Sequence, residues 1–238
     1  MKTIGVIVAA ALVALGVAGC VRTTDGTAVR ASGAAAPATS STTKTAPTRT
    51  AAPTRGPATP PTVPGVAPTL SAPIPPNALL CRQDPPGAGT STPAEVADPV
   101  APRLVVTVPA GWTSTPGQGD TALTMSGPDG MTGTVTIAAT TLDPAAAFTR
   151  YANEVSTKAP MTILNTLPAP FCGYSSQRLM GTWAGTPQKS IEFADRLTHI
   201  WTNTNKYLVV IHMQGPAGAP GFSVARAALT AQFTVVIP

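Results

Sequence analysis

The sequence predicts an α+β fold, an antiparallel β-sheet with helices packed on it, preceded by a disordered linker rich in proline and threonine. Three observations support this prediction. Short β-branched runs alternate with turn signals after residue 100, and two segments carry the apolar spacing of amphipathic helices. The stretch before residue 77 contains no aromatic residue. Consecutive strands joined by short turns favour antiparallel pairing, and helices then cover a face of the sheet.

The first predicted strands precede a helix, and they cover residues 103–108, 122–126 and 132–140. The first is a β-branched run that ends at Pro109. Gly127-Pro128-Asp129-Gly130 is a turn signal between the other two. The third strand alternates apolar residues with threonine, which is typical of a strand with one buried face.

A helix is predicted to begin at Asp143-Pro144, because aspartate caps helices and proline suits the first helical turn. Apolar residues then recur at helical spacing, and Pro160 ends the helix. These apolar positions are Phe148, Tyr151, Ala152 and Val155. The helix therefore presents one face that can pack on a sheet.

Further strands are predicted at 177–183, 189–201 and 206–214, the last two joined as a hairpin through residues 203–205. Tyr207, Val209, Ile211 and Met213 alternate and so share one face. A second helix over 222–232 leads into a last strand over 233–237.

The chain begins like a secreted protein, and residues 1–19 are predicted to be a signal peptide. Lys2 precedes an uncharged apolar run, over residues 3–18, that is short for a bilayer span of ~20 residues. The run ends in Val17-Ala18-Gly19-Cys20, which resembles the bacterial lipobox. This resemblance implies that Cys20 becomes the lipidated N-terminus. The alternative is an ordinary signal peptide, or a membrane span, with an incidental cysteine.

Residues 20–76 are predicted to form a disordered tether, and residues 77–238 the globular domain. Eleven prolines lie between residues 21 and 76, with threonine, serine and alanine in most other positions. Such a segment buries too little apolar area to offset its conformational entropy. Stalks of this composition are also common substrates of O-glycosylation, and a modified and an unmodified tether both stay open.

The net charge of +5 is concentrated before the domain. From residue 77 onward the chain has nine basic and nine acidic residues, so the domain is formally neutral. Nucleic-acid binding needs a basic surface that neutralises phosphates. The charge distribution therefore predicts no nucleic-acid partner.

Cys81 and Cys172 are the two cysteines within the predicted domain. An even number of cysteines in a secreted domain usually indicates a disulfide, and we expect these two to pair. Two free thiols, or one reactive cysteine, are the alternatives. No CxxC motif is present in the sequence.

The residues that carry chemistry form no recognisable catalytic motif, so the sequence predicts a protein that is not an enzyme and that needs no cofactor. His199 and His212 are the only histidines, and a metal site across a hairpin with Asp195 or Glu192 is an alternative. Both carboxylates are expected to be solvated strand positions. Ser176 follows a glycine but lies in no G-x-S-x-G motif.

The three tryptophans, Trp112, Trp183 and Trp201, are expected in the core. The alternative is that they line a concave site for a lipid or a sugar.

Several of these positions resemble the LpqN/LpqT lipoproteins of mycobacteria over roughly residues 100–238. The matching positions are Pro109, Gly111, Trp112, Phe171, Gly173, Gly181, Thr182, Tyr207, Leu208, Val209, Phe233 and Val235. The resemblance implies a PsbP-like fold, an extracytoplasmic location and an envelope-associated or host-facing role without enzyme chemistry.

Together these features predict a bacterial lipoprotein that is lipid-anchored on the extracytoplasmic face of the cell membrane. It would act as a binding or accessory module for an apolar envelope ligand or a protein partner. The alternatives are a structural or surface-exposed, antigen-like lipoprotein and an unrecognised hydrolase.

Overall fold

The computed structural model describes residues 62–68, 72–81, 89–186, 189–231 and 233–238. The chain divides into two units, Met1–Gly56 and Pro57–Pro238, and all of the described residues belong to the second. The predicted signal peptide, Cys20 and most of the predicted tether lie outside the described residues, so these remain predictions.

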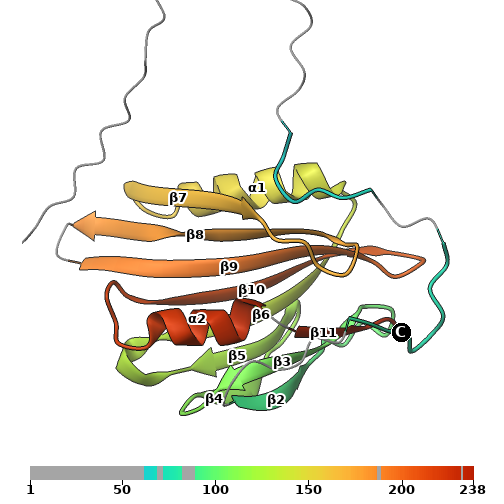
Figure 1. Ribbon diagram of the computed structural model, residues 1–238, viewed down its shortest axis with the longest axis horizontal. Helices are drawn as coiled ribbons and strands as arrows, with labels where there is room; N and C mark the ends of the chain where they lie inside the picture. Colours follow the sequence, from blue (N-terminus) through green and yellow to red (C-terminus); the bar gives the residue numbers. More distant parts are fainter. Residues whose placement is uncertain (1–61, 69–71, 82–88, 187–188, 232) are drawn as a thin grey trace, which may run out of the picture. The chain divides into compact units, whose positions relative to one another are not determined.

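The described residues form two antiparallel sheets and two α-helices, which confirms the α+β fold class (Figure 1). The seven-stranded sheet has the order β4-β5-β6-β10-β9-β8-β7, and the four-stranded sheet has the order β1-β11-β3-β2. The strands are β1 Leu79–Cys81, β2 Gly89–Ala94, β3 Arg103–Pro109, β4 Thr113–Pro116, β5 Thr121–Ser126, β6 Thr132–Thr140, β7 Met161–Pro168, β8 Ser175–Thr186, β9 Lys189–Trp201, β10 Lys206–Pro216 and β11 Phe233–Val236. The helices are α1 Pro144–Ser156 and α2 Phe222–Ala231, with a 3-10 turn, η1, at Pro128–Gly130.

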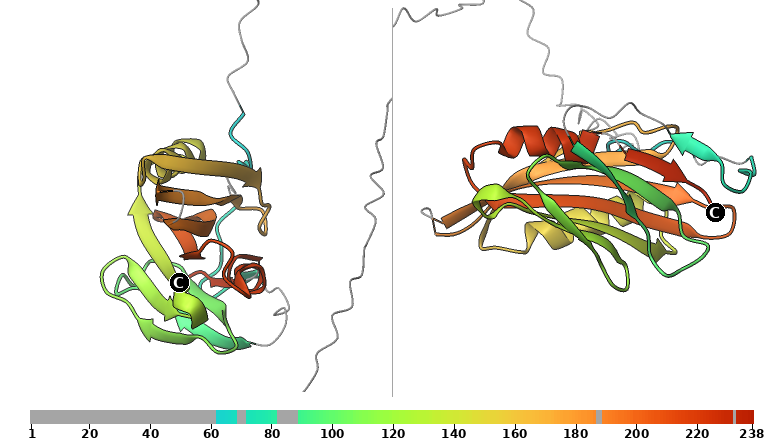
Figure 2. Two further views of the ribbon diagram at one scale, coloured as in Figure 1. Left: turned by 90° about the vertical axis from the view of Figure 1, so that its left-hand side faces the viewer. Right: turned by 90° about the horizontal axis from the view of Figure 1, so that it is seen from below.

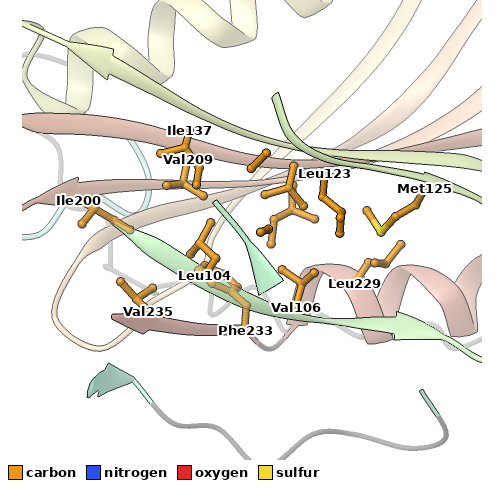
Figure 3. Close-up of a cluster of buried hydrophobic side chains, with 14 of the residues drawn as sticks. Leu104, Val106, Leu123, Met125, Ile137, Ile200, Val209, Leu229, Phe233 and Val235 are labelled. Carbon is orange, nitrogen blue, oxygen red and sulfur yellow. The ribbon is translucent and has the colours of Figure 1, made fainter. Parts of the chain in front are cut away.

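The main core lies between one face of the seven-stranded sheet and the four-stranded sheet with α2. The predicted alternation in β10 is confirmed, because Tyr207, Val209, Ile211 and Met213 are all buried in this core. Leu104 and Val106 of β3 and Val235 of β11 approach them from the other sheet (Figure 3). We call this side of the seven-stranded sheet the α2 face.

The opposite side of the same sheet, the α1 face, is covered by α1 over β7, β8 and β9 (Figure 2). The predicted helix start is confirmed, since the Asp143 carboxylate accepts a hydrogen bond from the Ala146 amide at 2.8 Å and proline follows it. Phe148 packs on Leu179 and Leu197, and Val155 packs with Trp183 and Phe193. Neither helix among the described residues is long and apolar enough to cross a bilayer.

The hairpin between β9 and β10 is also confirmed, with Trp201 paired to Lys206 across the turn. Asn203 in this turn has φ +69°, a left-handed conformation that asparagine tolerates. Its side chain donates to the Ile74 carbonyl at 2.7 Å and accepts from the Ile74 amide at 2.8 Å. Ile74 itself is buried in the main core. The domain therefore makes contacts with residues that precede position 77.

A second segment before position 77 also lies against the domain, and we call residues 62–68 the strap. The Gly65 carbonyl accepts from the Ser176 amide at 2.8 Å, and the Pro64 carbonyl accepts from Gln177 Nε2 at 2.6 Å. Val63 packs against the cluster under α1, so the strap lies on the α1 side. Both segments come from the part of the sequence assigned to the tether.

Candidate functional site

A groove of about 680 Å³ with an apolar lining runs along α2. It is bounded by the end of β3, by Trp112, by Met131 after η1, and by the outer side of α2. The α2 side chains that line it are small, namely Ser223, Val224, Ala225, Ala227 and Ala228. Of the described residues that line the groove, none is charged. Its size and apolar lining match those of sites for small organic ligands.

Local sequence explains why this groove forms. Gly111 has φ +81° and lets the chain turn sharply after β3, so that the Trp112 amide donates to the Pro109 carbonyl at 3.1 Å. The Trp112 ring then lies directly on Gly127, where a Cβ atom would approach the ring to 2.3 Å. Trp112 is half-buried as a result, with one side on the core and the other on the groove.

The other two tryptophans differ from Trp112. Trp183 is buried under α1, where it stacks on Phe193 at 4.2 Å and donates to the Val155 carbonyl at 3.2 Å. Trp201 is half-buried against the main core. The expectation that tryptophans belong to the core therefore holds for Trp183 and Trp201, whereas Trp112 both packs on the core and lines the groove.

A second, more polar hollow of about 340 Å³ lies between α1 and strands β6 and β10. Asp120, Arg150 and Glu154 contribute charge to it, and Tyr151 forms part of its wall. Burial, together with the nearby Asp195 carboxylate, raises the pKa of Tyr151 well above its ordinary value. The Tyr151 hydroxyl therefore stays protonated in this hollow.

The β9–β10 hairpin brings His212 and Asp195 together, with 2.5 Å between His212 Nδ1 and Asp195 Oδ1. The second imidazole nitrogen, Nε2, lies 3.2 Å from Gln214 Oε1. The expectation that Asp195 is solvated was wrong, because it lies on the α1 face with Phe193 and Leu197 and is fully buried. Glu192 is half-buried in the same strand.

The other candidate residues are separated from this pair. His199 Nε2 lies 3.0 Å from the Leu142 carbonyl, and burial lowers the pKa of His199. The strand register places His199 opposite Leu208, four residues from His212 along β10. Within the described residues, no group of three His, Cys, Asp or Glu side chains can hold a metal ion.

Ser176 is fully buried on the α2 face and belongs to a structural network. Its hydroxyl donates to the Leu197 carbonyl at 2.5 Å and accepts from Arg196 Nε at 2.9 Å. Arg196 also donates to the carbonyls of Ala169 and Thr230. Sequence reasoning missed this network, although Arg196, a basic residue between the apolar residues of β9, was a signal for it.

The pairing of Cys81 with Cys172 stays a prediction, because the side chain of Cys81 lies outside the described residues. The backbone is compatible with it. Cys81 pairs with Val235 of β11, and the ring of Phe171, next to Cys172, stacks on Phe233 of the same strand at 4.0 Å. Cys172 has φ +50°, within the turn that joins Phe171 to Tyr174.

Comparison with known proteins gives little beyond the fold. No protein-family model matches the chain, and no curated protein matches it. Among solved structures, the chain is similar to LpqN of Mycobacterium tuberculosis, described as involved in cell envelope biogenesis. The identity is 17%, the match covers 62% of this chain and 91% of that chain, and the TM-score is 0.49. A likeness at this level carries no argument about function, so membership of the LpqN/LpqT family stays a prediction.

Proposed function

We propose that this chain is a non-enzymatic lipoprotein of a bacterial cell envelope. A lipid on Cys20 would hold it on the extracytoplasmic face of the membrane, and its domain would bind an apolar ligand. The observation that carries the binding role is the groove along α2, which combines an exposed aromatic edge with an uncharged lining. Burial of a hydrocarbon chain there would stabilise the complex by about 25 cal/mol for each Å² removed from water.

The anchor is supported by the leader sequence alone. Several acyl chains on one residue bind a membrane stably, whereas a single chain binds marginally. Growth with a palmitate analogue is expected to label the wild-type protein and to leave Cys20→Ala unlabelled. Labelling of the variant would contradict the anchor without affecting the proposal for the groove.

The groove is tested by titrating the purified chain with a fluorescent fatty acid. Ala228→Leu places a larger side chain in the groove and is expected to weaken binding at least tenfold. Val224→Ser removes an exposed apolar side chain from the groove and is also expected to weaken binding. Val100→Ser is its matched control, because Val100 is exposed but does not line the groove. Equal binding by the wild type and Ala228→Leu would refute the proposed site. Saturable binding of a protein, with none of the fatty acid, would assign the groove to a protein partner.

The absence of enzyme chemistry is part of the same proposal. It is supported by the burial of Ser176 and by the engagement of both His212 nitrogens with Asp195 and Gln214. A nucleophile needs a base within hydrogen-bond reach and access to substrate. Hydrolysis of esters, peptides or glycans by the purified chain, lost in His212→Ala, would contradict it.

A further inference from the structure

Strand β7 carries an exposed apolar surface at the edge of the seven-stranded sheet. Within the described part of the chain, β7 pairs only with β8. Leu164 points to the α1 face and packs there, whereas the alternate residues point to the α2 face. On that side Met161 is 48% exposed, Ile163 is 72% exposed and Leu167 is 42% exposed. Helix α2 contacts β9 and β10, and Figure 1 shows β7 at the far edge of the sheet, away from α2.

Arginines adjoin this apolar edge. Arg178 on β8 pairs with Leu167 on one side and with Arg196 on the other, so the three side chains share the α2 face. Arg226 reaches the same region from α2, with its Nη1 at 3.5 Å from the Met180 sulfur. We call Met161, Ile163, Leu167, Arg178, Met180 and Arg226 the β7 surface.

The arginines of this region are not neutralised by ion pairs. Among the described residues, Arg178, Arg196 and Arg226 form no ion pair with a carboxylate. Arg178 and Arg196 are paired across β8 and β9, and burial, followed by the charge of Arg178, lowers the pKa of Arg196 to about 10. Glu192 shares this face, in register with Thr182 and Ile163, so the three arginines and this one carboxylate leave the region with a net positive charge.

Arg178 also has an unused donor. Its Nε atom is buried and has no hydrogen-bond acceptor among the described residues, whereas Arg196 donates to Ser176 and to backbone carbonyls. A buried donor without an acceptor costs about 1–3 kcal/mol. The Nε atom is shielded from solvent, so an oxyanion that approaches from outside would be bound by the terminal nitrogens of this half-buried side chain and would supply the missing negative charge.

We propose that the β7 surface docks on a membrane that contains anionic lipids. The arginines would bind lipid phosphates, and the exposed side chains of Ile163 and Leu167 would enter the interface between headgroups and acyl chains. A bilayer offers oxyanions and hydrocarbon within ~10 Å of each other, which is the combination that this surface presents. The proposal depends on neither the lipid on Cys20 nor the groove along α2.

The test uses residues 20–238 with Cys20→Ser, so that no acyl chain is present. Sedimentation with vesicles of phosphatidylglycerol and phosphatidylcholine measures the partition coefficient. The partition coefficient is expected to rise with the fraction of phosphatidylglycerol. It is expected to fall with added salt, because salt screens the attraction between exposed charges. Removing a basic side chain near an anionic surface weakens binding about fivefold, so Arg178→Gln with Arg226→Gln is expected to lower it more than tenfold.

Matched controls distinguish binding through the β7 surface from general electrostatic attraction between the chain and anionic vesicles. Arg150→Gln removes an exposed arginine from α1, on the opposite face, and is expected to bind like the starting chain. Ile163→Ser should weaken binding without altering the charge, and it remains informative if the arginine variants unfold.

Three results would overturn the proposal. They are equal binding to neutral and anionic vesicles, unchanged binding by the Arg178 and Arg226 variants, and full displacement by inorganic phosphate at constant ionic strength. The last result would assign the arginines to a free oxyanion. A dimer in solution that Ile163→Ser dissociates, without vesicle binding, would assign the surface to a second copy of the chain.

Discussion

Substitution of Gly65 by alanine tests whether the strap is part of the folded domain. Gly65 has φ +74°, a conformation that costs an L-residue about 1–2 kcal/mol. An added Cβ would also lie 2.0 Å from the Ser176 carbonyl oxygen, which belongs to the backbone of β8 and cannot rotate away. The strap must therefore leave β8, and each of its hydrogen bonds to Ser176 and Gln177 contributes about 1 kcal/mol. We expect Gly65→Ala to lower the free energy of unfolding by about 2–4 kcal/mol.

Gly218→Ala is the matched control for this substitution. Gly218 has φ +79°, but no heavy atom lies within 4 Å of the position of its Cβ. Gly218→Ala should therefore lower the free energy of unfolding only by the cost of the left-handed conformation, about 1–2 kcal/mol. Urea denaturation measures both variants, and limited proteolysis should cleave residues 62–68 faster in Gly65→Ala alone. Equal losses in the two variants, with equal proteolysis, would refute the docking of the strap.

Three further predictions concern the domain boundary, pH and the cysteines. A chain that starts at residue 77 lacks the strap and the buried Ile74, and it should unfold at least 2 kcal/mol more easily in urea than one that starts at residue 57. Burial lowers the pKa of His199 below 6.5, so the unfolded chain binds a proton at a higher pH than the folded chain does. The free energy of unfolding therefore falls as the pH falls through 6.5, and His199→Gln should lose less stability than the wild type between pH 7 and pH 5. Mass spectrometry without reductant should show a chain two hydrogens lighter if Cys81 and Cys172 pair, and Cys172→Ser should remove this difference.

Periodicity in the sequence predicted the elements that bury one face. The alternation in β10 and the cap at Asp143 both depend on residues that are close in sequence, and the structure confirms both. No predicted strand covered β1, β2, β4 or β7. For β2 and β4 the reason is that GTSTPA and TSTP contain proline and few apolar residues. They are strands because β3 and β5 supply their backbone partners. The residues of β2 and β4 do not by themselves indicate such pairing.

The same limit explains the error at Asp195. In most antiparallel sheets one face meets water, which made a carboxylate in 189–201 look solvated. Here α1 covers one face of β9, and the second sheet and α2 cover the other, so Asp195 on one face and Arg196 on the other are both buried. The contact with His212, 17 residues away, follows only from the register of the hairpin. The groove along α2 was also hidden, since Trp112 and Val224 are more than a hundred residues apart.

The strap and the two proposed surfaces lie on opposite faces of the seven-stranded sheet. Val63 packs on the α1 side, whereas the groove and the β7 surface belong to the α2 face. If the proposed lipid on Cys20 and the proposed β7 surface act together, the chain between them must reach from the α1 side to the α2 side of the sheet. Sheets pack about 10 Å apart, and the roughly 40 residues between Cys20 and the strap would span about 35 Å as the coil that their composition predicts. Such a span would let the anchor and the β7 surface engage one membrane together, and Gly65→Ala would extend it by releasing the strap.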